Sequence, residues 1–325
     1  MFISVRVIII FGFFLRILVS VWNGFFEFEF GQTADIGSFH ARAAEFSQNP
    51  SIQMCEHQPA HVFICGLGFL YFLTTDSLFQ GSLFSNFSWL ASALILFKTM
   101  KLLSIKKRLQ KQAMLIYVLL PSSIILTSLT LREPYQLLLV NLLIYAGLKV
   151  YLKKSYMYWF LVIFAVFFMS FLHGGLLIFG FFVMNCIMIL LARRRFKKGY
   201  NKIKLAFIVP VVVLISSVGI SYLLEYSKGY KKLSEGLVAG VVTYQKGGIS
   251  VAVGSNAAYR NQIDIKDNFD LLLFMPQALF QYLFEPMPWR ILRVMDLGLL
   301  FENILRVWLI WRTLTGIRRI SVTMK

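Results

Sequence analysis

Long apolar runs alternate with short polar segments along most of the chain. Many of these runs approach the roughly 18–20 residues that an α-helix needs to cross the hydrocarbon core of a bilayer. The pattern predicts an all-α, polytopic integral membrane protein with about eight transmembrane helices, in a range of eight to ten. No small-residue cleavage site follows the first run, so we expect an uncleaved helix there. We expect spans at residues 3–22, 81–103, 113–131, 135–152, 156–173, 174–192, 204–226 and 293–313.

Two further apolar segments, 60–75 and 269–289, break the alternation of sides. If either crossed the membrane, the basic cluster that follows it would move to the outer face, against the usual excess of Lys and Arg on the cytoplasmic side. We therefore expect both to be interfacial or re-entrant helices on the outer face, the second broken by its two prolines. The prediction is a single transmembrane domain over 1–325, with outer-face segments at 23–80 and 227–290.

Composition and charge favour the membrane class and remove one class of partner. Hydrophobic residues make up 58% of the chain, and the mean hydropathy is +0.69. The formal net charge is +18, and the basic residues sit in short clusters between apolar runs. That pattern is typical of cytoplasmic loops beside anionic lipid, so we expect membrane lipids and no nucleic acid among the partners. The clusters lie at 106–111, 152–154, 193–198 and 317–319.

The three cysteines, Cys55, Cys65 and Cys186, show no CxxC pattern and no Cys/His metal spacing. The sequence therefore indicates neither a disulfide framework nor a zinc site. Cys186 lies within an apolar run, where we expect a packing role.

The unusual polar residues fall on one side of the predicted topology. The inner loops are simple basic clusters, whereas the outer segments carry carboxylates, histidines and arginines. Polar groups at membrane depth are costly and usually face a cavity or a partner, so we expect a site on the outer face. The outer segments concerned are 31–46, 131–134, 171–175, 257–265 and 285–290.

Asp35, His40 and Arg42 lie in the first outer segment. In helical geometry Asp35 and Arg42 share a face, and His40 points elsewhere. Asp35 is a candidate general base for an acceptor hydroxyl, with His40 and Arg42 as candidate substrate contacts. The alternative for Asp35 is an exposed carboxylate at the start of an interfacial helix, where Asp suits the N-terminus.

Arg132 and Glu133 interrupt two apolar runs. The planar fork of Arg binds phosphate oxygens bidentately, so Arg132 is a candidate for a phosphate or diphosphate group, and Glu133 a candidate to orient it or to contact the acceptor. The alternative is a plain turn, because Pro134 suits the first position of a helix and Arg reaches lipid headgroups readily.

The remaining candidates are contacts to a phosphate, a sugar ring or a lipid. His173 precedes two glycines and fits a proton carrier, a phosphate partner or a histidine satisfied by backbone. Trp289 fits a stacking residue or a member of the interfacial aromatic belt. The other candidate contacts are Tyr259, Arg260, Glu285 and Arg290.

Three charged residues lie inside predicted spans. Glu302 and Arg306 are four residues apart, which predicts an intrahelical pair. Arg16, in the first run, is expected to pair internally or to line a cavity.

Three segments resemble known membrane proteins. The first outer segment, TADIGSFHARAAEF, followed by an apolar segment and a span that ends in basic residues, resembles the opening of C-type glycosyltransferases, which use polyprenyl-phosphate-linked sugars. PSSIILTSLTLREP and LFQYLFEPMPWR resemble segments of Wzy-type O-antigen or exopolysaccharide polymerases. By this resemblance Asp35 matches the first-loop acidic residue, which serves as base or acceptor contact.

The resemblance implies a bacterial inner-membrane glycosyltransferase that works on the periplasmic face. The donor would be a sugar or oligosaccharide on polyprenyl (di)phosphate, and the acceptor a lipid-linked glycan. The first outer segment has no DD, DxD or ExD pair, so we expect no metal and no cofactor. The alternatives are a transporter or flippase of a lipid-linked glycan, and a non-catalytic subunit that assembles with polysaccharide-making partners.

Overall fold

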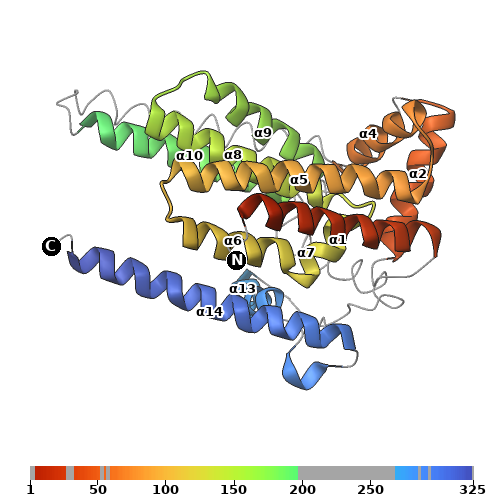
Figure 1. The fold of residues 1–325 in the computed structure, drawn as a ribbon. Helices are drawn as coiled ribbons and strands as arrows, with labels where there is room; N and C mark the ends of the chain where they lie inside the picture. The colour runs from red at the N-terminus through yellow and green to blue at the C-terminus, as the bar shows by residue number, and fades with distance from the viewer. Residues whose placement is uncertain are drawn as a thin grey trace. The chain divides into compact units, whose positions relative to one another are not determined.

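The computed structural model is all-helical in the part of the chain that it describes, with 88% helix and no strand (Figure 1). This confirms the predicted class. The chain divides into two compact units, Met1–Leu119 with Ser123–Lys231, and Leu120–Ser122 with Lys232–Lys325. The residues described are 4–26, 33–51, 55, 59–196, 268–284, 287–291 and 294–323.

The first unit holds most of the described helices. They are α1 (Val5–Phe25), α2 (Thr33–Gln48), α4 (Pro59–Leu73), α5 (Leu78–Leu102), α6 (Lys107–Leu119), α7 (Pro121–Ser128), α8 (Glu133–Lys153), α9 (Tyr158–Leu172) and α10 (Gly174–Phe196). The predicted single domain over 1–325 stays a prediction.

Four described helices, α1, α5, α8 and α10, are long and apolar enough to cross a membrane. α6 and α7 are bent by 57° at the break before Pro121 and count as a fifth span if they act together. Pro121 ends α6 because it has no N–H to continue the helical ladder. The structure therefore does not support the predicted count of about eight spans.

The smaller number of membrane spans has physical causes. α9, at 15 residues, measures about 22 Å at 1.5 Å per residue, less than the roughly 30 Å of a hydrocarbon core. α14 (Val294–Thr323) carries Asp296, Glu302, Arg306 and Arg312 along its length and is not among the apolar spans. The predicted span at 204–226 lies outside the described residues.

The expected outer-face segment 60–75 forms α4, a short apolar helix that packs against α2 at one end of the first unit (Figure 1). The two helices approach closely at Gly68, where an added Cβ would lie 2.7 Å from the carbonyl oxygen of Ala43. Phe63, Ile64 and Leu67 of α4 join the main buried cluster of the unit.

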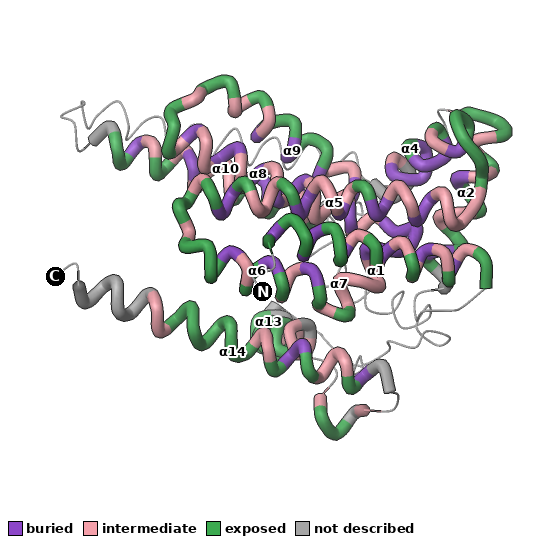
Figure 2. The backbone as a smooth tube through the Cα atoms, viewed as in Figure 1, coloured by how far each residue is buried: buried purple, intermediate pink, exposed green. Residues whose placement is uncertain are grey.

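The first unit buries polar side chains beside its apolar core and exposes large apolar ones. Buried and exposed positions alternate along α1 and α5 (Figure 2). Buried polar side chains lie on α1, α5 and α8, whereas large apolar side chains face outward, as expected of helices surrounded by lipid. The buried polar residues include Arg16, Ser20, Ser82, Ser85, Asn86, Ser92 and Asn141, and the exposed apolar ones Ile10, Phe14, Phe87 and Phe160.

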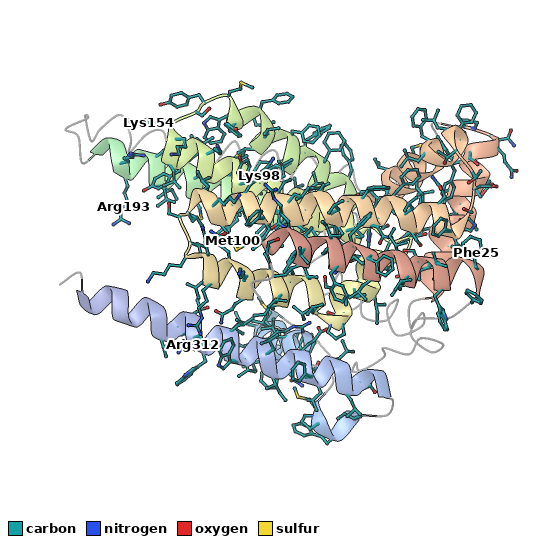
Figure 3. All side chains as sticks on the ribbon, in the orientation of Figure 1. Phe25, Lys98, Met100, Lys154, Arg193 and Arg312 are labelled. Atoms are coloured by element: carbon teal, nitrogen blue, oxygen red, sulfur yellow. A yellow bond between two sulfur atoms is a disulfide. The ribbon has the colours of Figure 1, made fainter. Side chains whose placement is uncertain are left out.

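The two ends of the first unit differ in charge. Lys154 and Arg193 lie at one end and Phe25 at the other (Figure 3). The end that holds Lys154 and Arg193 also receives the end of α5 and the start of α6, and we call it the basic end. Its cations are Lys98, Lys101, Lys106, Lys107, Lys153, Lys154, Arg193 and Arg194. α1, α7 and α9 run away from the basic end, and α5, α8 and α10 return to it.

The second unit pairs α13 (Asn268–Phe284) with α14 and includes the short 3₁₀ helix η1 (Pro288–Arg290). Asn303 Nδ2 donates to the carbonyl of Phe284 at 2.7 Å. Arg306 lies 3.5 Å from the carboxylate of Glu302, which confirms the predicted intrahelical pair. The predicted segment 269–289 corresponds to α13 and part of η1, and the described part of α13 ends before the two prolines.

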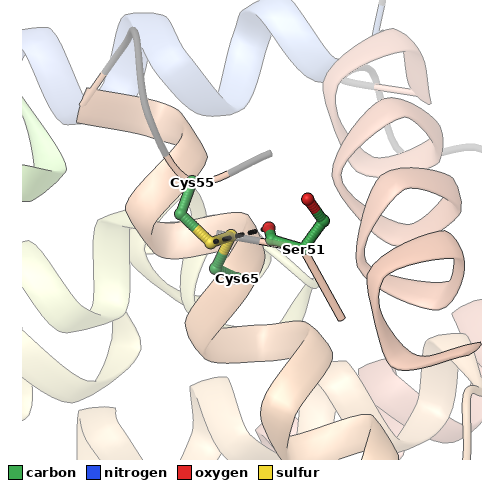
Figure 4. The surroundings of a disulfide bond; sticks show 3 residues. All are labelled: Ser51, Cys55 and Cys65. Carbon is green, nitrogen blue, oxygen red and sulfur yellow. Dashed lines mark hydrogen bonds between the residues drawn. A yellow bond between two sulfur atoms is a disulfide. The ribbon is translucent and has the colours of Figure 1, made fainter. Parts of the chain in front are cut away.

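Cys55 and Cys65 form a disulfide, with their Cα atoms 5.8 Å apart (Figure 4). The carbonyl oxygen of Ser51 lies 3.7 Å from Sγ of Cys55. The sequence prediction that there is no disulfide framework is therefore wrong. The spacing of the two cysteines matches no disulfide signature, so the bond is visible only in the folded chain. Cys186 is a free, half-buried cysteine, as expected.

Candidate functional site

Charged and polar side chains from several segments gather at the end of the first unit opposite the basic end. They come from α2, α4, the α4–α5 connection, the α7–α8 connection, the start of α8 and the α9–α10 connection. We call this group the polar end. Its members are Asp35, His40, Tyr71, Asp76, Thr130, Arg132, Glu133 and His173, linked by the hydrogen bonds and electrostatic interactions described below.

Arg132 sits between α7 and α8, immediately before the Glu133–Pro134 start of α8. Its Nη1 donates to the carbonyl of Leu172 at 3.3 Å, and its guanidinium carbon lies 5.9 Å from the ring centre of Phe39. Among the described residues the other N–H groups of Arg132 have no hydrogen bond. Toward the described part of the chain, the half-buried guanidinium therefore has most of its N–H donors unengaged.

Glu133 adds a carboxylate to this corner. Its Oε2 is buried and has no hydrogen-bond partner among the described residues. The charges of Arg132 and Asp35 both act on the Glu133 carboxylate, so the three residues lie within electrostatic range. A buried polar atom without a partner is costly and rare, and it is a feature expected where a ligand or a proton completes the site.

His173 ends α9, and its Nδ1 accepts the backbone N–H of Gly175 at 3.0 Å. An Nδ1 that accepts must carry a lone pair, so the ring proton of neutral His173 is on Nε2. Burial lowers the pKa of His173 from its ordinary value, and the nearby positive charge of Arg132 lowers it further. His173 is thus held neutral beside Arg132, with an Nε2–H donor.

His40 contacts Tyr71 of α4. Its Nδ1 lies 3.1 Å from the Tyr71 hydroxyl, and the two rings meet edge to face. Burial lowers the pKa of His40, and the carboxylate of Asp76 partly opposes this. Burial raises the pKa of Tyr71, and an interaction with the nearby Thr130 hydroxyl partly opposes this. Neutral His40 and protonated Tyr71 therefore share one hydrogen bond.

Gly81 of α5 makes this contact possible. A Cβ at Gly81 would lie 2.5 Å from the Tyr71 hydroxyl and 2.7 Å from the Thr130 hydroxyl. Sequence reasoning missed Tyr71, Asp76, Thr130 and Gly81, because none carries a local motif and they meet only in the folded chain.

Asp35 lies exposed in the first turn of α2, as the helix-start alternative predicted. Arg42 is also exposed and shares its face by helical geometry. His40 lies on the opposite, packed side of α2. The base role of Asp35 stays a prediction. Its electrostatic interaction with Glu133 supports that role, and its exposure to solvent weakens it.

The other predicted contacts stay predictions. Tyr259, Arg260 and Glu285 lie outside the described residues. Arg290 ends η1 in the second unit, and Trp289 of η1 is 78% exposed, which fits the belt interpretation as well as the stacking one.

A second polar region lies inside the first unit, around Arg16, which is fully buried. Its guanidinium lies 3.6 Å from the ring centre of Trp89. It donates to two hydroxyls and two carbonyls, which confirms that it pairs internally. The acceptors are Thr127 Oγ1 at 2.7 Å, Ser123 Oγ at 3.1 Å, Gly12 O at 3.0 Å and Val118 O at 3.2 Å.

Within the described residues, no three His, Cys, Asp or Glu side chains gather closely enough to hold a metal ion. No known family matches this sequence, and no curated protein or solved structure matches it. The class that fold and composition define is a helical membrane protein, and any narrower assignment rests on the side chains of the polar end.

Proposed function

We propose that this protein is a membrane glycosyltransferase of bacterial surface-polysaccharide synthesis. It would transfer a sugar or oligosaccharide from a polyprenyl (di)phosphate to a lipid-linked glycan, in the manner of a polymerase. One observation carries the proposal: within the described part of the chain, the half-buried Arg132 offers unengaged N–H donors beside the unpartnered Glu133 Oε2. A lone cation among lipids needs no such corner, whereas a departing phosphate does.

The roles follow from chemistry. Arg132 neutralises the phosphate or diphosphate as it leaves the anomeric carbon, and the Nε2–H of His173 adds a neutral donor. Glu133 or Asp35 contacts the acceptor hydroxyl. A lipid phosphate is a good leaving group, so no strong general acid is required.

The sidedness follows from the two ends of the first unit. The basic end is typical of cytoplasmic loops, which supports a polar end that faces outward. The Cys55–Cys65 disulfide supports the same orientation, because disulfides persist in oxidising compartments such as the bacterial periplasm. We therefore propose the bacterial inner membrane, with the site facing the periplasm.

A transporter or flippase of lipid-linked glycan is the second candidate, and one observation favours it. Polar side chains lie deep in α1, α5, α7 and α8, as expected of a path through the membrane. They are largely engaged with one another: Asn86 Nδ2 donates to Ser20 Oγ at 2.8 Å, and Asn141 Nδ2 to Ser92 Oγ at 2.8 Å. A transport path requires these bonds to open.

A gene deletion separates the candidates. The surface-polysaccharide profile of the deletion strain is compared after complementation with wild type, Arg132→Ala or Arg194→Ala. A polymerase predicts loss of the long-chain ladder with single-repeat product retained, rescued by wild type and Arg194→Ala but not by Arg132→Ala. A flippase predicts loss of single-repeat product as well. A ladder that survives the deletion contradicts the proposal.

A further inference from the structure

We propose that a cluster of three side chains near the basic end of the first unit binds the headgroup of an anionic phospholipid. The cluster consists of the ammonium group of Lys149 and the hydroxyls of Tyr145 and Tyr158. It lies apart from the polar end and does not depend on the proposed function. From the sequence, anionic lipid is expected only as a general partner of the basic clusters, and these three residues have no role.

Lys149 lies between two tyrosine rings. Its Nζ is 5.5 Å from the ring centre of Tyr145 and 5.4 Å from that of Tyr158, and the two rings meet edge to face with their centres 6.1 Å apart. Tyr145 precedes Lys149 by one turn of α8, and Tyr158 begins α9. The rings attract the ammonium group, which holds it in place without using any of its three N–H donors in a hydrogen bond.

No acidic group neutralises this lysine in the described part of the chain. Lys149 has no hydrogen bond or ion pair there, and neither tyrosine hydroxyl has a hydrogen-bond partner. Glu133 is the one acidic residue of the sequence between Asp76 and Glu225. It lies at the other end of α8, about 24 Å along the helix axis. The three donor groups are half-buried, and a half-buried charge without a counterion is costly. A bound anion removes that cost.

The neighbouring charges favour a headgroup with a net negative charge. Lys153 follows Lys149 by one helical turn, about 6 Å nearer the end of α8. Arg194 of α10 is held beside the same helix, because its Nη1 donates to the carbonyl of Tyr151 at 2.7 Å. Lys154 lies at this end as well (Figure 3). These cations repel the ammonium part of a zwitterionic headgroup and attract an anionic one.

The apolar side chains around the cluster fit a lipid better than a soluble anion. On α8, Ile144 precedes Lys149 and Leu152 follows it, and both are exposed. On α9, Phe160 is exposed two residues after Tyr158 begins the helix. Acyl chains are as apolar as these side chains and can cover them, whereas a soluble phosphate gains nothing from them. The cluster therefore joins three hydrogen-bond donors to a surface that suits acyl chains.

The site is tested by the affinity of the purified protein in detergent for phosphatidylglycerol, measured by native mass spectrometry. Lys149→Met removes the charge and keeps an unbranched side chain, and Lys101→Met is the matched control. Lys101 also belongs to the basic end and lies over one ring, that of Phe97, with its Nζ 4.3 Å from the ring centre. Unlike Lys149, it is exposed.

We expect Lys149→Met to bind phosphatidylglycerol about tenfold more weakly than wild type, because one charge-assisted hydrogen bond is lost. Lys101→Met should stay within about twofold of wild type, because exposed charges contribute little. The double variant Tyr145→Phe/Tyr158→Phe keeps both rings and loses both hydroxyls, so we expect about threefold to tenfold weaker binding. Lys149→Arg keeps a cation that binds phosphate and should retain binding. Phosphatidylcholine should bind the wild type more weakly than phosphatidylglycerol.

Four results would overturn the proposal. Equal weakening by Lys149→Met and Lys101→Met shows a diffuse basic surface without a site. Equal affinity of the wild type for phosphatidylcholine and phosphatidylglycerol removes the selection by charge. Competition by millimolar inorganic phosphate shows a site for soluble anions. If Lys149→Met does not fold, the double tyrosine variant decides, and unchanged affinity in that variant contradicts the site. A protein that binds phosphatidylglycerol as expected but transfers no sugar supports this site and overturns the proposed function alone.

Discussion

Arg16 and Arg132 have the same side chain but differ in burial and in how many of their N–H donors are used. Arg16 is fully buried, stacked on Trp89, and donates to four oxygen acceptors. Arg132 is half-buried, lies farther from its aromatic neighbour, and donates to one carbonyl among the described residues. A guanidinium whose donors are used by the protein holds helices together, and we infer that Arg132, with spare donors among the described residues, is available to a ligand.

The break between α6 and α7 explains why Arg16 is there. In an unbroken helix the N–H of Ser122 would pair with the carbonyl of Val118, and the break at Pro121 removes that donor. Arg16 supplies a replacement to Val118 and also bonds Ser123 and Thr127 on the far side of the break. We infer that Arg16 fastens α1 to both halves of the bent pair.

Arg16→Met should give the largest effect, and it tests stability alone. It leaves two carbonyls and two hydroxyls without this donor, and a buried group left unsatisfied costs about 1–3 kcal/mol. We expect a large drop in the melting temperature in detergent and poor yield. Arg16→Lys, which keeps the charge but not the fork, should fall between Met and wild type. An Arg16→Met protein that is as stable as wild type but inactive would contradict a purely structural role for Arg16.

Arg132→Ala should lower activity and leave stability almost unchanged, which is the opposite of Arg16→Met. We expect transfer to fall about 10²–10³-fold, as for other donors that stabilise a developing negative charge. Stability should change by less than about 1 kcal/mol, since one hydrogen bond to a neutral carbonyl, that of Leu172, is lost. Arg194→Ala is a matched control, because Arg194 also donates Nη1 to one carbonyl, that of Tyr151, and lies over one ring. Equal activity of the two variants removes the distinction on which the comparison rests.

Cys55→Ser tests whether the disulfide stabilises the polar end, because Cys65 lies on α4, the helix that carries Tyr71. Chain-entropy arguments give about 2–3 kcal/mol for a loop of this length, with the sequence separation being 10. We expect a lower melting temperature for Cys55→Ser. We expect an unchanged melting temperature for Cys186→Ser, because Cys186 is free. Identical melting temperatures in all three proteins would show that the disulfide does not hold the polar end.

Acidification should have the smallest effect, confined to the polar end. Burial lowers the pKa values of His40 and His173 in the folded protein. Above about pH 6.5 both histidines are neutral in both states, and stability is level. Below it the unfolded chain binds protons first, so stability is lost as pH falls toward the folded pKa values. We expect the melting temperature to fall modestly below pH 6.5, and less in the double variant His40→Asn/His173→Asn.

The sequence was enough for the class and for part of the site. Apolar run lengths predicted α5 and α8 closely, and charged interruptions singled out Arg132, Glu133 and His173, which the fold brings into range of each other. Apolar run length alone overestimated the span count, because it ignores where a helix breaks or stops. Pro121 was visible in the sequence as a break within 113–131, but the 15-residue length of α9 was not.

The features that were missed are long-range. The Cys55–Cys65 bond follows no spacing rule, and the polar chain of His40, Tyr71 and Thr130 joins α2, α4 and the α7–α8 connection. Close approach at Gly81 allows that chain to form, and a single glycine in an apolar run gives no sign of what packs against it.

The central claim is that the spare donors of Arg132 engage a lipid-linked phosphate. The direct measurement is the affinity of the purified protein in nanodiscs for polyprenyl diphosphate, compared among wild type, Arg132→Ala and Arg194→Ala. We predict at least tenfold weaker binding in Arg132→Ala, because charge-assisted hydrogen bonds contribute about 1.5–3 kcal/mol, and binding within twofold of wild type in Arg194→Ala. Equal affinities for all three proteins, or equal weakening by both substitutions, would contradict the account.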